Sequence, residues 1–162
     1  MINNTNYDVE KDYENTKEIV DIDETTVYEK NYNIPNVEEW KLEIPKINLV
    51  ANIAEGTNKE ILDQYIGHFE ETQKYVGNIG LAAHNRGYKV NYFQKLKELE
   101  IGDVIYYTYN GIQKNYVVEL KTIIKDTEWN KLRNTEDNRL TLITCVEDKP
   151  SFRRCIQAKE SK

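Results

Sequence analysis

Three residues, Cys145, His84 and Arg153, are the types that acyl transfer needs, and each lies at or near the end of an expected strand. A cysteine thiolate attacks a carbonyl carbon, and an adjacent imidazolium lowers the thiol pKa and later protonates the leaving amine. A guanidinium stays charged and can hold a peptide carbonyl or stabilise an oxyanion. The set therefore predicts a cysteine acyl-transfer site, provided that the fold brings the three together.

Each of these residues also has an ordinary structural explanation when taken alone. A free cysteine is often buried as a small apolar side chain, a lone histidine is often a hydrogen-bonded structural residue, and Arg153 with Arg154 could be a solvated pair. Cys145 and Arg153 are eight residues apart across a tight connection, which predicts adjacent antiparallel strands. Alternation puts Arg153 and Arg154 on opposite faces, so one of them should face the sheet interior or a cleft.

The second histidine and the second cysteine are not expected to take part in the chemistry. His68 follows the first expected helix, and we interpret it as a structural or surface residue. Cys155 lies two residues beyond Arg153 and therefore on the same face of its strand. A disulfide between Cys155 and Cys145 would remove the nucleophile, so we expect Cys155 to be a core thiol. Neither CxxC nor a Cys/His zinc spacing occurs.

Alternating and apolar runs predict the elements that position these residues. A capping box at Thr57–Glu60 and a stop at Gly67 indicate a first helix, and Asn110-Gly111 is a typical hairpin turn. The expected strands are 40–44, 47–53, 77–83, 104–109, 112–124, 140–145 and 152–158, and the expected helices are 57–66 and 91–99. Seven or eight short strands with two short helices predict an all-β fold, a closed or nearly closed β-barrel.

Charge separates the chain into two parts. Residues 1–30 hold 9 acidic and 3 basic side chains, and residues 31–162 hold 19 of each. We expect 1–36 to be an acidic tail or linker, either flexible or packed on the domain as a short segment, and 37–162 to be one catalytic domain. A neutral body argues against non-specific nucleic-acid binding. No apolar run approaches the roughly 20 residues that span a bilayer, so we expect a soluble chain.

Three segments resemble the sortase family. Thr141–Cys145 (TLITC) is similar to the TLxTC signature, Phe152–Ala158 to the closing strand that an arginine opens, and Leu81–Asn85 to the strand end that carries the catalytic histidine. The resemblance covers about Trp40 to Lys159. It implies a closed eight-stranded sortase-type β-barrel, and the roles that it implies are Cys145 as nucleophile, His84 as general acid/base, Arg153 as the essential arginine, Thr144 as a substrate-binding residue and the Val146 N–H as an oxyanion donor.

The resemblance also implies a reaction. Cys145 would cleave the Thr–Gly-type bond of an LPxTG-like sorting signal on a surface protein, form a thioester and pass the acyl group to an amine of a cell-wall precursor. A pilin lysine is the alternative acceptor. No cofactor is needed, and the implied location is the outer face of the membrane of a Gram-positive bacterium, through an anchor outside this chain. The pocket between the first helix region and the 125–139 loop should select the sorting signal.

Departures from the family pattern favour class A or D. Residues 1–39 lack the Asp-Pro-aromatic lid motif of pilin-polymerising (class C) sortases, and the 125–139 stretch is too short for the class B helix. Glu70 and Glu71 could belong to a calcium site, although adjacent acids are more often a solvated surface. A papain-like enzyme is disfavoured because His84 precedes Cys145, and a catalytically inactive surface-binding barrel is the non-enzymatic alternative.

Overall fold

The computed structural model describes residues 17–23, 26–31 and 38–162. The chain divides into two units, Met1–Asn36 and Val37–Lys162. In the first unit, β1 (Lys17–Asp23) and β2 (Thr26–Asn31) pair as antiparallel strands. These strands were not predicted from the sequence, although β-branched residues are frequent in both. The flexibility expected for 1–36 stays a prediction, and the rest of that segment lies outside the described residues.

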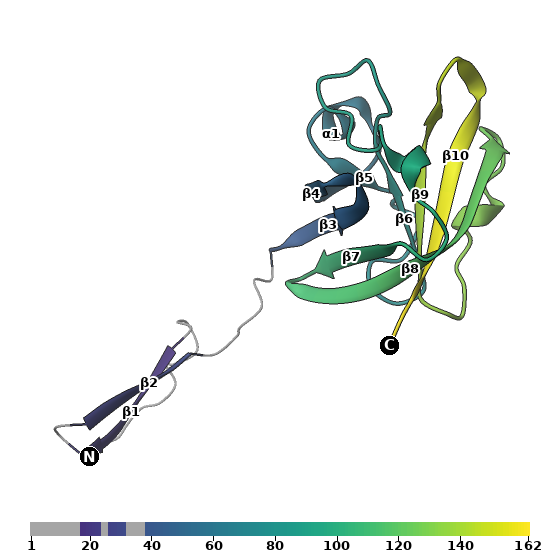
Figure 1. The fold of residues 1–162 in the computed structure, drawn as a ribbon. Helices are drawn as coiled ribbons and strands as arrows, with labels where there is room; N and C mark the ends of the chain where they lie inside the picture. The colour runs from purple at the N-terminus through teal and green to yellow at the C-terminus, as the bar shows by residue number, and fades with distance from the viewer. Residues whose placement is uncertain (1–16, 24–25, 32–37) are drawn as a thin grey trace. The chain divides into compact units, whose positions relative to one another are not determined.

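Within residues 38–162, eight strands close into one barrel in the order β10-β8-β7-β3-β4-β5-β6-β9 (Figure 1). Closure confirms the predicted fold class. The pairs β4–β5 and β6–β9 are parallel, and the other pairs are antiparallel. The strands are β3 Trp40–Ile44, β4 Leu49–Glu55, β5 Ile66–His68, β6 Asn78–Ala82, β7 Val104–Tyr109, β8 Ile112–Lys125, β9 Arg139–Val146 and β10 Lys149–Glu160.

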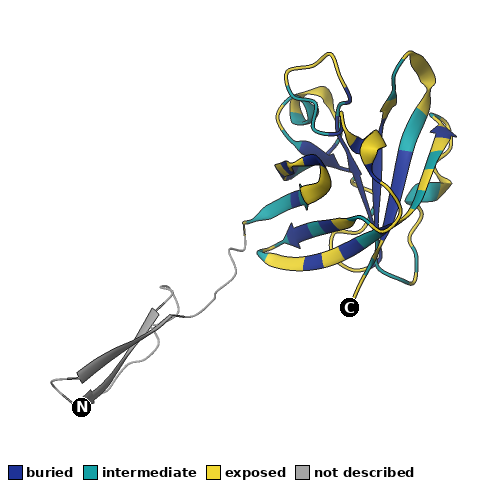
Figure 2. Ribbon diagram, in the orientation of Figure 1, coloured by how far each residue is buried: buried dark blue, intermediate teal, exposed yellow. Residues whose placement is uncertain are grey.

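Apolar side chains fill the barrel. Buried residues alternate with more exposed ones along strands such as β8 (Figure 2). On β9, for example, Leu140 and Leu142 point inward with no exposed surface. Ile143 points to the outer face, where it joins Ile124 and Cys155 in a small second cluster. Phe69 and Leu132 pack against this outer cluster. The outer face of β9 and β10 is thus partly apolar and partly covered.

The first expected helix is shorter than predicted. Only α1 (Lys59–Leu62) is helical, and its cap is Asn58, whose side chain accepts a hydrogen bond from the Ile61 N–H at 3.0 Å, so the predicted Thr57 cap was wrong. The end of the predicted helix is strand β5, which pairs parallel to β4. A Cβ at Gly67 would lie 2.4 Å from the Gly56 carbonyl oxygen, so glycine permits this close approach.

The second expected helix, 91–99, does not form an α-helix. Only η4 (Leu96–Glu98), a 3₁₀ turn, is helical there. Its apolar residues Phe93, Leu96 and Leu99 recur every three positions, a spacing that fits the three residues per turn of a 3₁₀ helix. A further turn of this kind, η3 (Pro45–Ile47), precedes β4, and η5 (Asn130–Leu132) lies between β8 and β9. Among the described residues, no helix has the length and apolar character needed to cross a bilayer.

Candidate active site

Cys145, His84 and Arg153 lie on or just beyond three strands that are neighbours in the barrel. Antiparallel pairing places Arg153 of β10 directly opposite Cys145 of β9. Parallel pairing places Ala82 of β6 beside Ile143 of β9, so His84, two residues on, continues alongside Cys145. The three residues therefore form a row across β6, β9 and β10 in which Cys145 is central.

The same three side chains share the outer face of the barrel. Ile143 and Cys155 belong to the outer cluster, and each is two residues from Cys145 or Arg153 on its own strand. A spacing of two keeps a side chain on the same face of a strand. His84 is also two residues beyond Ala82, while Ala83 points into the barrel core. Cys145 is exposed, and the His84 side chain keeps 13% of its surface accessible.

A bulge aims the Arg153 side chain. The pairing between β9 and β10 is irregular between Lys149 and Arg153. The Arg153 Nη1 donates to the carbonyls of Pro150 at 2.9 Å and Phe152 at 2.8 Å, which braces the guanidinium against the bulge. A guanidinium has three more N–H donors besides those of Nη1. Arg154 points away, as alternation predicts, and its Nη2 lies 3.6 Å from Glu147 Oε1.

Two side chains next to the central pair tie its strands together. The Asn85 Nδ2 donates to the Cys145 carbonyl at 2.9 Å, and the Thr144 hydroxyl donates to the Ala83 carbonyl at 2.7 Å. Asn85, next to His84, thus binds the carbonyl of Cys145 itself, and Thr144, next to Cys145, binds the carbonyl just before His84. Both side chains are buried. This reciprocal tie fixes where His84 and Cys145 leave their strands. No motif or periodic pattern had marked Asn85 for this role.

The structure places the two predicted substrate-binding residues differently from each other. Thr144 is 3% exposed and its only hydroxyl proton is donated to Ala83, so here it acts on the strand ends. Val146 is half-buried and pairs with Lys149 at the two-residue turn that closes the hairpin. In that turn Asp148 has a φ of 62°, the left-handed region that Asp tolerates. Substrate contacts for both residues stay predictions.

The His84 ring is held from two further elements. The Tyr88 ring stacks on it with centroids 3.6 Å apart and an interplanar angle of 7°. Asp63, just after α1, brings Oδ1 to 3.5 Å from His84 Nε2. That distance is at the outer limit of a hydrogen bond, and Nε2 is buried without hydrogen-bonding alignment to any group. Tyr88 and Asp63 were not predicted from the sequence, because only tertiary folding brings them to the ring.

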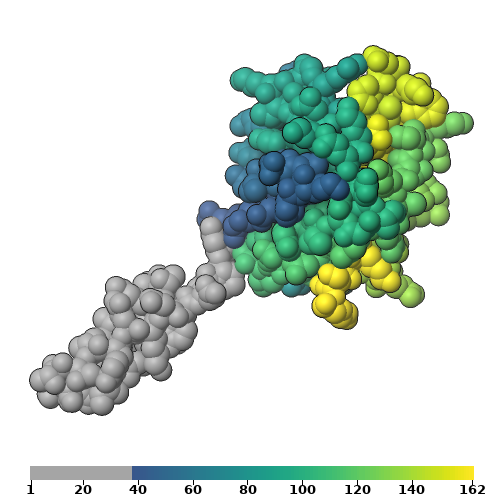
Figure 3. All heavy atoms as spheres, in the orientation of Figure 1, coloured from purple at the N-terminus to yellow at the C-terminus, as the bar shows by residue number. Residues whose placement is uncertain are grey.

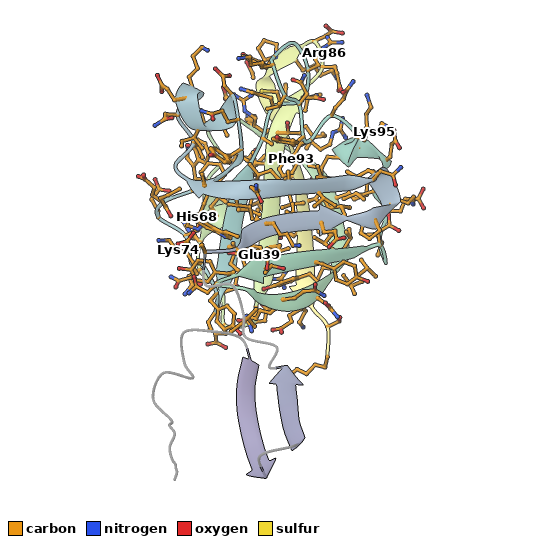
Figure 4. The ribbon with its side chains drawn as sticks, turned by 90° about the vertical axis from the view of Figure 1, so that its left-hand side faces the viewer. Glu39, His68, Lys74, Arg86, Phe93 and Lys95 are labelled. Atoms are coloured by element: carbon orange, nitrogen blue, oxygen red, sulfur yellow. The ribbon has the colours of Figure 1, made fainter. Side chains whose placement is uncertain are left out.

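The loop after His84 also contacts the β9–β10 turn. The Arg86 Nη2 donates to Asp148 Oδ1 at 2.8 Å. Figure 3 shows the two segments meeting at one end of the barrel. In Figure 4, Arg86 lies at this end, and Lys74 and Glu39 lie toward the other. The site thus occupies one end of the barrel, where loops and strand ends converge.

A pocket of about 620 Å³ lies on the outer face, and none of Cys145, His84 and Arg153 lines it. Phe69 and Leu132 line it and also pack on the outer cluster that contains Ile143. Its other lining residues are Thr57, Glu71, Thr72, Trp129, Arg133 and Asn134. This is the region between the first helix and the 125–139 loop in which the sequence predicted a substrate pocket. Two residues of strand, about 7 Å, separate Ile143 from Cys145.

His68 and Cys155 are placed apart from this chemistry. His68 has no exposed surface, and its ring nitrogens lie 3.0 Å from Glu55 Oε2 and 2.8 Å from the Gln73 carbonyl (Figure 4). It is a structural residue of β5, not of a helix end. Cys155 is a free, fully buried thiol, and burial raises its pKa to about 12. Such a thiol is a core residue, as the sequence predicted.

The acidic pair considered for calcium lies on the surface. Glu70 and Glu71 are both exposed, and Glu71 reaches the edge of the pocket. Within the part of the chain that the structure describes, no three His, Cys, Asp or Glu side chains gather into a metal site. The expectation that the chemistry needs no cofactor is not tested by this observation.

Comparison with known proteins points to one family. A model described as the sortase domain matches residues 42–161. Sortase A of Listeria monocytogenes is 35% identical over 102 residues, which is 62% of this chain and 41% of that protein. Sortase D of Bacillus subtilis is 32% identical over 107 residues, which is 64% of this chain and 52% of that protein. The chain thus spans about half the length of these curated relatives.

Solved structures agree with the fold. The crystal structure of sortase C-1 from Actinomyces oris superposes with a TM-score of 0.73 at 28% identity, covering 80% of this chain and 76% of that one. The region that the sortase-domain model matches, residues 42–161, contains all eight strands of the barrel except the first two residues of β3. The curated relatives are named sortase A and sortase D, and the solved structures include a sortase C, so similarity alone does not assign the class.

Proposed function

Because the chain belongs to the sortase family, we propose that it is a cysteine transpeptidase in which Cys145, His84 and Arg153 carry out acyl transfer. One observation carries the proposal. A thiol, an imidazole and a guanidinium lie at neighbouring strand ends, and a pocket opens on the outer face, where two of its lining residues pack on Ile143 of β9. Cys145 is the exposed one of the two thiols, which suits a nucleophile that must reach a peptide.

The reaction has two acyl-transfer steps. The Cys145 thiolate attacks the carbonyl carbon of a Thr–Gly-type peptide bond, the carbon–nitrogen bond breaks, and the His84 imidazolium gives its proton to the leaving amine. The product is a thioester on Cys145. A second amine attacks that carbonyl, loses a proton to His84, and breaks the carbon–sulfur bond. The thiolate is regenerated, so the two steps balance without an oxidant or reductant.

Arg153 suits the charge that develops in both steps. It stands directly opposite Cys145, and its guanidinium is braced on two carbonyls. Remaining N–H donors can therefore point at the substrate carbonyl or at the oxyanion that forms from it. The Val146 N–H, next along the backbone from the nucleophile, is the second proposed donor. Thr144 contributes by holding the strand ends, and a direct substrate contact is its predicted second role.

The pocket supports an extended peptide as the substrate. Its apolar surface comes from Phe69, Leu132 and the half-exposed ring of Trp129, which stacks edge-on to Phe69 at 6.3 Å. A peptide with apolar residues a few positions before its scissile bond could fill this pocket while its carbonyl meets Cys145. An LPxTG-like sorting signal has that pattern, with Leu and Pro before Thr–Gly.

Class, partners and location complete the proposal. We assign class A or D, which anchors surface proteins that carry such a sorting signal to an amine of a cell-wall precursor. The relatives named sortase A and sortase D support this assignment. Polymerisation of pilins through a lysine amine is the alternative. The proposed place of action is the outer face of the membrane of a Gram-positive bacterium.

A peptide-cleavage assay tests the proposal. Purified protein is incubated with a quenched fluorescent LPxTG peptide and hydroxylamine as the acceptor amine. We expect cleavage with formation of the peptide hydroxamate, and we expect Cys145→Ala to lower turnover by at least about a thousandfold, as for other covalent nucleophiles. Replacing hydroxylamine with a glycine peptide or a lysine peptide separates the cell-wall acceptor from the pilin acceptor.

Cys155→Ala is the matched control, because it removes a thiol that substrate cannot reach. This variant should keep most of the activity while losing some stability to the cavity that it leaves. Turnover that persists in Cys145→Ala would overturn the assigned nucleophile. Peptide binding without any turnover by the parent protein would favour the inactive binding barrel.

A further inference from the structure

His84 has a charged neighbour that the acyl-transfer scheme does not use. Asp63 Oδ1 lies 3.5 Å from His84 Nε2, and this nitrogen is buried without an aligned hydrogen-bond partner. The stacked Tyr88 ring covers one face of the imidazole and limits its rotation. A histidine ring has two nitrogens, so when Nε2 is turned to Asp63, only Nδ1 is left for proton transfer.

Asp63 is itself held in place. Lys59, four residues earlier and in α1, donates from Nζ to Asp63 Oδ2 at 2.7 Å. The other carboxylate oxygen, Oδ1, is the one that faces His84. The hydrogen bond from Lys59 is the largest influence that lowers the pKa of Asp63, and His84 adds to it. Asp63 therefore stays ionised at the pH values at which a histidine titrates.

We infer that Asp63 is a positioning residue for His84, one that orients the ring through Nε2 and stabilises its imidazolium form. The inference rests on the proposed function, in which His84 is the general acid and base. It adds a fourth member to the row. From α1 through β6 and β9 to β10, carboxylate, imidazolium, thiolate and guanidinium then alternate in charge.

The charges around His84 favour this role. Two cations disfavour the imidazolium form of His84. Arg153 lies on the far side of Cys145, and Lys59 lies on the far side of Asp63. The Cys145 thiolate and the Asp63 carboxylate favour the imidazolium form. Tyr88 stacks as a neutral ring. An opposite charge within about 4–6 Å favours the charged form of an ionisable group, and Asp63 supplies one that is independent of the thiol.

A histidine titration followed by NMR tests the inference without turnover. The chain has two histidines, so ¹⁵N-histidine labelling gives one signal set for His84 and one for His68. The titration is made in the Cys145→Ala protein, which removes the thiolate. We expect the NMR titration of His84 to move to lower pH in Asp63→Asn and that of His68 to stay in place.

Glu60→Gln is the matched control, since it removes an exposed carboxylate from the same helix. It should leave both histidine titrations unchanged. A His84 titration that is also unchanged in Asp63→Asn would overturn the inference. A shift of His68 together with His84 would overturn it as well, because it would show a general change of structure.

The pH profile of kcat/KM gives the second readout in the Cys145 enzyme. The limb of the profile that reports the protonation of His84 should move to lower pH in Asp63→Asn. Asp63→Glu, which keeps a carboxylate, should move it part of the way back toward the parent. A simple loss of rate at every pH, with an unmoved profile, would mean a structural role only. Because the NMR result needs no activity, failure of this inference is distinguishable from failure of the transpeptidase proposal.

Discussion

At the scale of single residues, the two neighbouring arginines differ in the face of β10 that they occupy. Arg153 stands opposite Cys145 on the outer face, and Arg154 reaches the turn carboxylate Glu147. Both are half-buried and both are charged. They differ in the face of β10 that they occupy, so Arg154 serves as the control for Arg153.

Arg153→Lys should lower kcat/KM by about 10²–10³-fold, the cost of losing one oxyanion donor. A lysine keeps the charge but lacks the planar fork that bonds two bulge carbonyls and a substrate together. Arg154→Lys, measured with the same peptide, should remain close to the parent. Equal losses in the two variants would contradict the assignment, because a shared effect would come from the strand and not from the site.

The two cysteines should differ sharply in their reactivity. A thiolate is the nucleophile toward thiol reagents, and burial both hides Cys155 and raises its pKa to about 12. A disulfide reagent at pH 8 should therefore label one thiol per native chain and two in denaturant. Native Cys145→Ala should give none. Rapid labelling of that native variant would show that Cys155 is accessible and would contradict the core position.

At the scale of elements, the β9–β10 turn is fastened to the loops that follow β6. The Glu147 Oε2 accepts from Lys97 of η4 at 3.0 Å, and its Oε1 lies 3.6 Å from Arg154. Its own backbone N–H, then Lys97, then Asn85 lower the pKa of Glu147 from 4.5 to about 2. One ionised carboxylate thus joins the turn, the 3₁₀ segment and the residue after His84.

This carboxylate should make part of the stability depend on pH. Because its folded pKa lies below its usual value, ionised Glu147 stabilises the fold above pH 4.5, and this contribution is lost as the pH falls from 4.5 to about 2. At pH 7, Glu147→Gln should have a lower Tm than the parent, and the difference should shrink over that window. Calorimetry of Glu98→Gln, an exposed acid of η4, controls for net charge. A difference that is constant with pH would contradict the link.

Elements that depend on local chemistry were predictable from the sequence. Asn110 and Gly111 have φ angles of 52° and 76°, the two positive values that a tight hairpin turn requires, and β7 and β8 pair around them as expected. Strand β5 was not predictable. The helical pattern of its residues is overridden by pairing with β4. That pairing is possible because Gly67 has no side chain to clash with the Gly56 backbone.

The site follows the same division. Cys145, His84 and Arg153 could be found because their types are informative and their strands have clear ends. Asp63 and Tyr88 reach the imidazole from a short helix and a loop, and neither position carries a periodic or motif signal. Asn85 and Glu147 were equally hidden. Contacts made only after the barrel closes leave no pattern in the sequence.

At the scale of the whole molecule, the fold and the excess charge reside in different units. The core residues lie between Leu42 and Ala158, and the net charge of −6 comes from residues 1–30. A chain of residues 37–162 should therefore keep the Tm of the full chain and lose its acidic character in ion exchange. Differential scanning fluorimetry of both forms checks this. A drop of about 4 °C or more, roughly 1 kcal/mol for a domain of this size, would show that the first unit stabilises the barrel.

The parallel pairing of β6 with β9 has a consequence for when the candidate site assembles. It joins segments about 60 residues apart, and contacts of such high contact order form late, after nearby hairpins have assembled. A nascent chain therefore holds its sulfur and its imidazole on segments that have not yet met. The thiol of Cys145 and the imidazole of His84 can act together only after β6 and β9 have paired.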